Sequence, residues 1–270
     1  MNSIIKLMIQ RFTPEVDKKP YYKSYEVAFF EGMTILDALM KVKEELDGTL
    51  SFRASCRMGI CGSCAMIVND EPVLACHTQI RELKTDNFII KPLCNYSIVK
   101  DLIIDLTILF EKHRNILPGI VHIKEPEKNA QFIQHSEELN SYLQFSYCIK
   151  CGICLAACPT CSTDKNFVGP QAIAQAYRYS VDLRDEGFKE RKNLVDKNHG
   201  IWHCHLAGAC SIACPKGVDP ALGIQKFKGL IVSSYFCKKK HIKALQAEVI
   251  DYSIKPVGEV PKAPEKTVKK

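Results

Sequence analysis

Two similar cysteine runs in the second half of the chain restrict its fold more than any other feature. The stretch "CIKCGICLAACP" places Cys148, Cys151, Cys154 and Cys158 in the spacing C-x2-C-x2-C-x3-C-P. This spacing is typical of bacterial ferredoxins, in which three thiolates bind one iron-sulfur cluster and the fourth binds a second cluster. The segment is therefore expected to fold back against another set of cysteines.

The partner run is "CHLAGACSIACP", which supplies Cys204, Cys210 and Cys214 but carries Ala207 where the template has its second thiol. Crossed pairing of the two runs predicts a four-thiolate site and a three-thiolate site. The first site contains Cys148, Cys151, Cys154 and Cys214, and the second contains Cys158, Cys204 and Cys210. Because a methyl group cannot bind iron, we expect a 4Fe-4S cluster in the first site and a 3Fe-4S cluster in the second.

A third group of cysteines lies in "SCRMGICGSCAMIVNDEPVLAC". Cys56, Cys61 and Cys64 follow C-x4-C-x2-C and Cys76 completes the set, which is the plant-type 2Fe-2S arrangement with a shorter final gap. Gly59 and Gly62 permit close approach of backbone N–H groups to the sulfurs, while Arg53 and Arg57 offset their negative charge. A structural zinc site is the less favoured alternative, because zinc sites usually pair C-x2-C units across a longer insert.

The 14 cysteines of this 270-residue chain favour metal or redox chemistry over disulfides. The opening "MNSIIKLMIQRF" lacks the apolar core and cleavage site of a secretory signal, which indicates a reducing compartment. Cys94, Cys161 and Cys237 are expected to be free. Cys161 is the one alternative source of a replacement thiol, since it follows Cys158 by three residues.

Charge and hydropathy argue against two other functions. The net charge of +7 is partly gathered in residues 238–243 and 261–270 with few aromatic residues, so nucleic-acid binding is not expected. Residues 254–270 are predicted to form a basic, disordered tail. The apolar segments 101–110 and 229–236 are shorter than the roughly 18–20 residues that cross a bilayer.

Periodicity divides the chain near residue 100. Alternating apolar residues predict strands around 5–9 and 25–29 and a hairpin over 65–77, and residues 34–46 predict a helix capped by Thr34. That helix would bury Ile35, Leu39, Val42 and Leu46 on one face. Helical spacing begins near residue 98, and a later helix begins at Pro170. We therefore expect an α+β protein with a 2Fe-2S ferredoxin-like domain over 1–100 and a helical two-cluster domain over 101–253.

These motifs, with "FVGPQAIAQAYRYSVDLRD" and "CSIACPKGVDP", closely resemble the iron-sulfur subunit of succinate dehydrogenase and fumarate reductase over about residues 1–240. The resemblance implies a β-grasp 2Fe-2S domain followed by an all-α dicluster domain. It also implies that the three clusters carry electrons between the FAD of a flavoprotein subunit and a quinone. A hydrophobic membrane-anchor subunit would hold this quinone at the cytoplasmic face of the inner or plasma membrane. Substrate chemistry would belong to the flavoprotein, so no catalytic residue is expected here.

The resemblance further implies that Pro159, His205 and Lys228 lie near the quinone, although a helix-turn proline, a surface histidine and a solvated lysine are their ordinary interpretations. Thr163 stands where ubiquinone-using dehydrogenases typically have tryptophan. Two alternative functions remain: an electron-transfer subunit of a soluble fumarate or heterodisulfide reductase, and a free multi-cluster ferredoxin.

Overall fold

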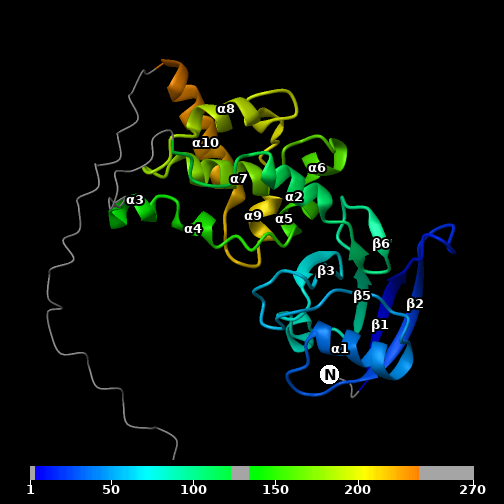
Figure 1. Cartoon of the computed structure of the whole chain (residues 1–270). Helices are drawn as coiled ribbons and strands as arrows, with labels where there is room; N and C mark the ends of the chain where they lie inside the picture. Colours follow the sequence, from blue (N-terminus) through cyan, green and yellow to red (C-terminus); the bar gives the residue numbers. More distant parts are fainter. Residues whose placement is uncertain (1–3, 123–133, 237–270) are drawn as a thin grey trace, which may run out of the picture.

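A computed structural model describes residues 4–122 and 134–236. Figure 1 shows a mixed sheet with one helix at the N-terminal end and a group of helices stacked against it. The N-terminal elements are β1 (Ile4–Arg11), β2 (Tyr21–Ala28), α1 (Ile35–Lys41), η1 (Val42–Leu46), β3 (Ala65–Val68), β4 (Glu71–Leu74), η2 (Ile80–Leu83), β5 (Asn87–Lys91), β6 (Ile98–Lys100) and β7 (Ile103–Ile104).

The remaining elements described are all helical. They are α2 (Thr107–Arg114), α3 (Ser136–Asn140), α4 (Leu143–Ser146), α5 (Ile153–Ala156), α6 (Pro159–Thr163), α7 (Pro170–Ser180), α8 (Phe188–Val195), η3 (Ile201–His203), α9 (Ala209–Ile212) and α10 (Pro220–Phe236).

The five-stranded sheet has the order β2-β1-β5-β3-β4. Strand β1 pairs antiparallel with β2 and parallel with β5, and β3 pairs antiparallel with both β4 and β5. The alternation of Ile5, Leu7 and Ile9 places all three side chains in the core. The two predicted N-terminal strands and the hairpin near residues 65–74 are therefore confirmed.

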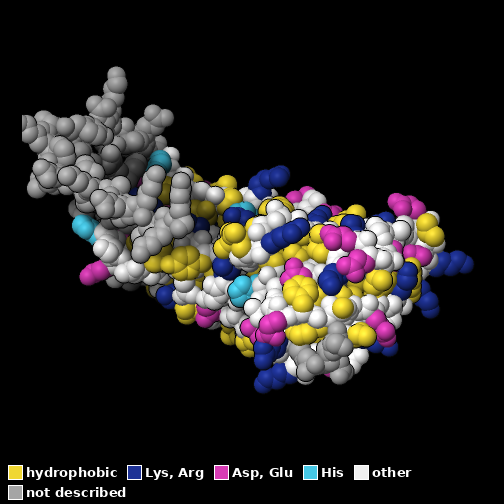
Figure 2. Space-filling model, turned by 90° about the horizontal axis from the view of Figure 1, so that it is seen from below, with side chains coloured by type: hydrophobic (Ala, Val, Ile, Leu, Met, Phe, Trp, Pro, Cys, Tyr) yellow, Lys and Arg dark blue, Asp and Glu magenta, His cyan; other side chains and the backbone are white. Residues whose placement is uncertain are grey.

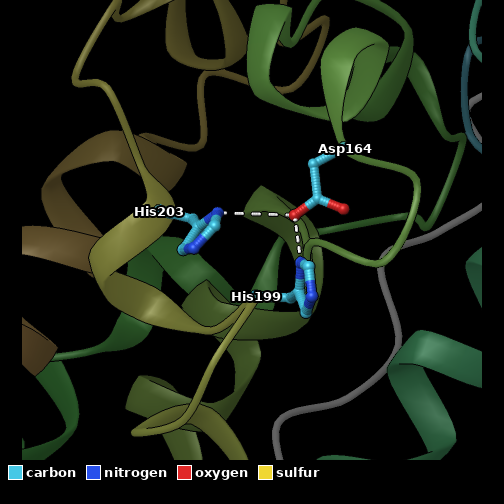
Figure 3. Close-up of side chains that lie close together, drawn as sticks. All are labelled: Asp164, His199 and His203. Atoms are coloured by element: carbon cyan, nitrogen blue, oxygen red, sulfur yellow. Dashed lines mark hydrogen bonds and ion pairs between the residues drawn. The ribbon is translucent and has the colours of Figure 1, made fainter.

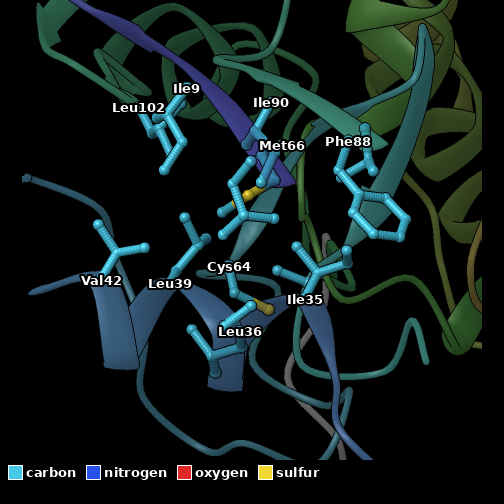
Figure 4. Close-up of a cluster of buried hydrophobic side chains, with 14 of the residues drawn as sticks. Ile9, Ile35, Leu36, Leu39, Val42, Cys64, Met66, Phe88, Ile90 and Leu102 are labelled. Carbon is cyan, nitrogen blue, oxygen red and sulfur yellow. The ribbon is translucent and has the colours of Figure 1, made fainter. Parts of the chain in front are cut away.

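Helix α1 covers the sheet, and its start is the one predicted from the sequence. The Thr34 hydroxyl accepts a hydrogen bond from Asp37 N–H, and the Asp37 carboxylate accepts one from Thr34 N–H, which completes a capping box. Ile35 and Leu39 then pack against the sheet, and Figure 4 shows Cys64 among the same apolar side chains. The cysteine loop is thus anchored in the first hydrophobic core.

The predicted burial of Leu46 is wrong, because its side chain is 54% exposed. The helix ends in the π-helical turn η1, where Asp47 N–H donates to the Val42 carbonyl five residues earlier. This wider turn has fewer degrees of rotation per residue than an α-helix, so it moves Leu46 away from the face that buries Val42.

Residues 98–104 form the strand pair β6 and β7, so the helix expected from residue 98 begins only at Thr107. Asp101 turns the chain with a positive φ of 48°. Its carboxylate accepts hydrogen bonds from Phe12 N–H and Ser51 N–H, and its own N–H donates to the Phe12 carbonyl. These long-range bonds override the local helical pattern. Leu102 and Ile104 belong to the first core.

A buried polar network joins this turn to β1. Arg11 Nε lies 3.0 Å from Asp101 Oδ1, and its Nη1 lies 2.8 Å from Asp47 Oδ2. The Asp101 side chain is 1% exposed and that of Arg11 is 6% exposed. Tyr25 also donates to Asp47 from its hydroxyl group. Since burial of an unpaired charge is costly, the network fixes β1, β2 and the β6–β7 turn to one another.

The second core surrounds α7, which begins with Pro170 at its first turn, as predicted. Helix α10 packs along α7, and the rings of Phe145 and Tyr177 meet edge to face with centroids 5.3 Å apart. A Cβ on Gly223 would lie 2.9 Å from the Phe145 ring, so this glycine allows α10 to approach closely.

The helical pattern after Pro170 is interrupted between Ser180 and Phe188. Asp182 accepts a hydrogen bond from Arg184 N–H, and Asp185 accepts one from Gly187 N–H. These local side-chain bonds compete with helical backbone bonds. Asp185 also forms a fully buried ion pair with Arg191, whose guanidinium donates to the carbonyls of residues 117 and 119.

No helix within residues 4–122 and 134–236 has the length and apolar character that crossing a membrane requires. On the face in Figure 2, basic and acidic side chains are interspersed with apolar ones. Cys237 and the tail over 254–270 lie outside the described residues.

We predict that Asp101→Asn destabilises the N-terminal part by about 3–5 kcal/mol, because Arg11 would lose a buried counter-charge. The loss would be measured as a lowered unfolding midpoint in urea. Asp70→Asn is the control, since Asp70 forms an exposed ion pair with Lys91 and should change the midpoint little. Equal effects from the two substitutions would contradict the importance of the buried network.

Candidate metal centres

The loop over residues 56–64 wraps its backbone around sulfur atoms. Cys56 Sγ accepts hydrogen bonds from the N–H groups of Met58, Ile60 and Cys61 at 3.3–3.5 Å. Gly59 N–H lies 3.2 Å from Cys76 Sγ, and Cys76 N–H lies 3.4 Å from Cys64 Sγ. Such N–H donors stabilise the negative charge of a thiolate-bound cluster.

The conformation of this loop depends on left-handed backbone positions. Arg57, Gly59 and Gly62 have φ values of 56°, 69° and 75°. Alternation of such residues with ordinary ones turns successive N–H groups toward one side of the loop and creates a concave anion site. This arrangement fits the four thiols to a 2Fe-2S cluster and explains both glycines that the sequence singled out.

The thiols of this loop have different environments. Hydrogen bonding by the Ser63 side chain, followed by contacts with Cys56, lowers the pKa of exposed Cys61 to about 6. Burial raises the pKa of Cys64 to about 12. Cys61 thus lies on the solvent side of the loop, and Cys64 lies on the side that is buried in the first core.

A second set of thiols lines one cavity between the two ferredoxin runs. Its lining includes Cys148, Cys151, Cys154 and Cys214, together with Gln171 and Gln175 of α7. Burial raises the pKa of Cys151 to about 11 and that of Cys154 well above its ordinary value. Because metal ligands are thiolates, filling this cavity with a cluster must release protons.

A third set lines a separate cavity next to α6, α9 and α10. Cys158, Cys204 and Cys210 face it together with Ala207, and within residues 4–122 and 134–236 no fourth cysteine lines it. The last cysteine of each run therefore lies with the earlier cysteines of the other run: Cys214 shares the second cavity, and Cys158 shares the third. Three thiols and one methyl group fit a cluster that lacks one iron.

The two runs have the same backbone signature, which identifies the counterpart of Ala207. In the first run Lys150 and Gly152 have φ values of 54° and 84°, and in the second run Leu206 and Gly208 have values of 60° and 70°. Each glycine is the N-cap of a short helix, α5 or α9. Ala207 therefore occupies the position of Cys151, between the two left-handed residues.

Cys161 does not belong to the lining of the three-thiol cavity. Its side chain is hydrogen bonded to that of Cys158. This contact, together with burial, raises the pKa of Cys161. The same contact is the main cause that lowers the pKa of Cys158 to about 6. Cys161 therefore contacts Cys158 without lining the cavity itself.

The first two cysteine sites are in direct contact. A Cβ on Gly62 would lie 2.8 Å from Cys151 Cβ and 2.9 Å from Cys151 Cα. Glycine is required here both by this approach and by its positive φ. The loop of the first site is therefore packed against a cysteine of the second.

Asn95 and Tyr96 join the two parts of the chain, and the sequence reasoning missed both. Asn95 Nδ2 donates to the carbonyls of Leu155, Ala156 and Cys158, and the Tyr96 hydroxyl donates to the Gly152 carbonyl. These bonds reach carbonyls at both ends of helix α5. The one local signal in the sequence is the residue type of Asn95, because asparagine tolerates a left-handed conformation, and Asn95 adopts one with a φ of 66°.

The three residues assigned to the quinone by resemblance do not all meet. Pro159 and His205 line the three-thiol cavity, whereas Lys228 is not among its lining residues. The Lys228 ammonium instead lies 5.5 Å from the centroid of the Trp202 ring. Trp202 belongs to η3, which directly precedes Cys204.

Comparison with known protein families places a "2Fe-2S iron-sulfur cluster binding domain" at residues 6–111 and a "4Fe-4S dicluster domain" at residues 144–218. The fumarate reductase iron-sulfur subunit of Mycobacterium tuberculosis is 40% identical over 87% of this chain and 95% of the relative. The mitochondrial succinate dehydrogenase [ubiquinone] iron-sulfur subunit of Candida glabrata is 34% identical over 82% of this chain and 88% of the relative.

Among solved structures, a chain of the Mycobacterium smegmatis Sdh1 complex in the apo form has the same fold, with a TM-score of 0.76. The match covers 89% of this chain and 100% of that chain, at 21% identity. The shared fold is a mixed α and β fold, and the family matches assign to it an N-terminal 2Fe-2S ferredoxin-like domain with a sheet and a C-terminal 4Fe-4S dicluster domain.

We predict that Gly62→Ala displaces the first cysteine loop from Cys151 and lowers both the thermal unfolding midpoint and the EPR signal of the reduced 2Fe-2S centre. Gly32→Ala is the matched control, because Gly32 also has a positive φ, 80°, but nothing lies within 4 Å of an added Cβ. It should show only the left-handed strain of about 1–2 kcal/mol. Equal losses in both variants would mean that the contact with Cys151 is unimportant.

Proposed function

The chain belongs to the family of iron-sulfur subunits of fumarate reductase and succinate dehydrogenase, and we propose that it conducts electrons between a flavoprotein and a membrane-bound quinone. Its cofactors are 2Fe-2S and 4Fe-4S clusters and the 3Fe-4S cluster that this family also carries. When bound, these clusters supply one-electron transfer, while the chain positions them and tunes their potentials.

The proposed ligands follow from the three sets of thiols. The 2Fe-2S cluster would be held by Cys56, Cys61, Cys64 and Cys76, the 4Fe-4S cluster by Cys148, Cys151, Cys154 and Cys214, and the 3Fe-4S cluster by Cys158, Cys204 and Cys210. The observation that carries the assignment of the 4Fe-4S and 3Fe-4S ligands is the equivalence of Ala207 and Cys151 between two loops of the same backbone signature.

The protein residues would determine the order of the centres. Gly62 lets the first loop touch Cys151, so the first and second sites are neighbours. The second and third sites share helices: Cys154 lies within α5 and Cys158 follows that helix, while Cys210 lies within α9 and Cys214 follows it. These contacts support an order in which the 4Fe-4S cluster would lie between the other two.

We propose the finer fold as a β-grasp domain followed by an all-α dicluster domain, with a division near residue 100 and a basic tail from residue 254. The sheet order, with its helix packed on one face, and the wholly helical content of the described residues after 104 support the two-domain division.

Exposed apolar side chains at the two ends support two different partners. Met58 and Ile60 are 69% and 53% exposed beside Cys61. Leu206, which lines the three-thiol cavity, is 54% exposed, and Ile212 at the end of α9 is 88% exposed. Apolar side chains near a redox site are suited to a dry interface. The first end would meet the flavoprotein and its FAD, and the second would meet the membrane anchor, with Pro159, His205 and Lys228 toward quinone. The complex would then lie peripherally at the cytoplasmic face of the membrane.

The alternatives of a soluble heterodisulfide-type subunit and a free ferredoxin are not favoured, because relatives from both respiratory enzymes match over most of their length.

Co-purification tests the assembly. An affinity-tagged chain isolated from membranes with mild detergent should bring down a flavoprotein and a hydrophobic anchor in equal amounts. Recovery of the chain alone from the soluble fraction would refute this assembly.

The Ala207→Cys substitution tests the third site. The new thiol should permit a fourth iron to bind, so the 3Fe signal of the oxidised protein should be lost and a second four-iron signal should appear on reduction. Ala207→Gly is the control and should keep the 3Fe signal, because glycine adds no ligand. An unchanged spectrum in the cysteine variant would contradict the assignment of Ala207.

A further inference from the structure

Asp164, His199 and His203 converge beside the three-thiol cavity, and none of them belongs to the cysteine sets described above. Asp164 directly follows α6, which begins after Cys158, while His203 is the last residue of η3 and precedes Cys204. His199 lies just before η3. Figure 3 shows the His203 ring to the left of the carboxylate and the His199 ring below it, each joined by a dashed line to the same oxygen.

The distances suit a small metal ion. His199 Nδ1 lies 2.7 Å from Asp164 Oδ2, and His203 Nδ1 lies 3.4 Å from the same oxygen. One ligand atom from each of the three residues lies within 4.8 Å of those of the other two. Tetrahedral bonds of about 2.0–2.1 Å separate neighbouring ligand atoms by roughly 3.3 Å. The His203 spacing already has this value, and the His199 spacing requires an opening of roughly half an ångström.

The backbone fixes His199 independently of the ion. His199 has a φ of 59°, and its carbonyl accepts a hydrogen bond from Val168 N–H at 3.0 Å. A Cβ on the following Gly200 would lie 1.9 Å from the Val195 carbonyl oxygen, so only glycine allows this turn. His199 is thus a non-glycine residue held in a left-handed conformation, and in this conformation its imidazole reaches Asp164.

The carboxylate is oriented in the same way. Asp164 Oδ1 accepts a hydrogen bond from Asn166 N–H at 2.9 Å, which leaves Oδ2 directed toward the two histidines. The side chain of Asp164 is 19% exposed, and those of His199 and His203 are 41% and 42% exposed. Solvent can therefore complete the coordination of an ion held by three protein ligands.

We propose that Asp164, His199 and His203 form a binding site for Zn²⁺. Two imidazoles and one carboxylate are a ligand set that zinc accepts, whereas Ca²⁺ and Mg²⁺ prefer oxygen ligands alone. The bound ion would join the segment after Cys158 to the segment before Cys204, and so would fasten together two sides of the three-thiol cavity. The three ligands are separate from the cysteines, so the site does not depend on the cluster assignments.

Zinc binding is tested on the full chain with its complete iron content. After equilibrium dialysis against Zn²⁺, mass spectrometry should find about one zinc per chain with no loss of iron. His199→Asn, which preserves the left-handed turn, and Asp164→Asn should each weaken binding by more than about tenfold. His135→Asn, at an exposed histidine before α3, is the matched control and should leave binding unchanged.

X-ray absorption at the zinc edge identifies the ligands directly. Nitrogen and oxygen neighbours at about 2.0–2.1 Å without sulfur are expected. Sulfur neighbours at about 2.3 Å would place the zinc on cysteines and overturn the proposal. Absence of zinc uptake, or uptake that both site variants leave unchanged, would show that the three side chains form only a hydrogen-bonded cluster.

Discussion

The crossing of the two ferredoxin runs is the constraint on which the rest of the structure depends. Each run sends its fourth cysteine into the cavity lined by the first cysteines of the other, so helices α5 and α9 must lie side by side. The same short helices serve both cavities, which keeps the two sites close without a long connecting element. Helices α7 and α10 then cover the pair, and the aromatic packing of Phe145 against Tyr177 closes the second core.

The N-terminal part is held to this helical unit at the place where electrons would cross. Asn95 and Tyr96 bond to carbonyls at both ends of α5, and Gly62 brings the first cysteine loop against Cys151. The contact combines these hydrogen bonds and the missing side chain with apolar packing, because Ile153 of α5 is fully buried in the first core. The hydrogen bonds restrict the orientation of the two parts, because each bond depends on the direction of its donor.

The sequence predicted those features that depend on local chemistry. Cysteine spacing predicted three sets of thiols whose members the fold brings together, and the capping pair Thr34 and Asp37 set the start of α1. The resemblance to the respiratory iron-sulfur subunits was confirmed by relatives spanning most of the chain. Features that depend on distant partners were missed. In place of the helix expected from residue 98, the chain forms a turn that Arg11 and Asp101 hold. Asn95 and Asp164 contact their partners only in the folded chain.

EPR-monitored redox titration of the intact complex tests the central claim, that eleven cysteines hold three different clusters and that Ala207 leaves the third without a fourth iron. The account predicts a 3Fe-4S signal in the fully oxidised protein, followed on reduction by the separate signals of one 2Fe-2S and one 4Fe-4S centre. An oxidised protein without the 3Fe signal, together with two four-iron signals after reduction, would contradict it.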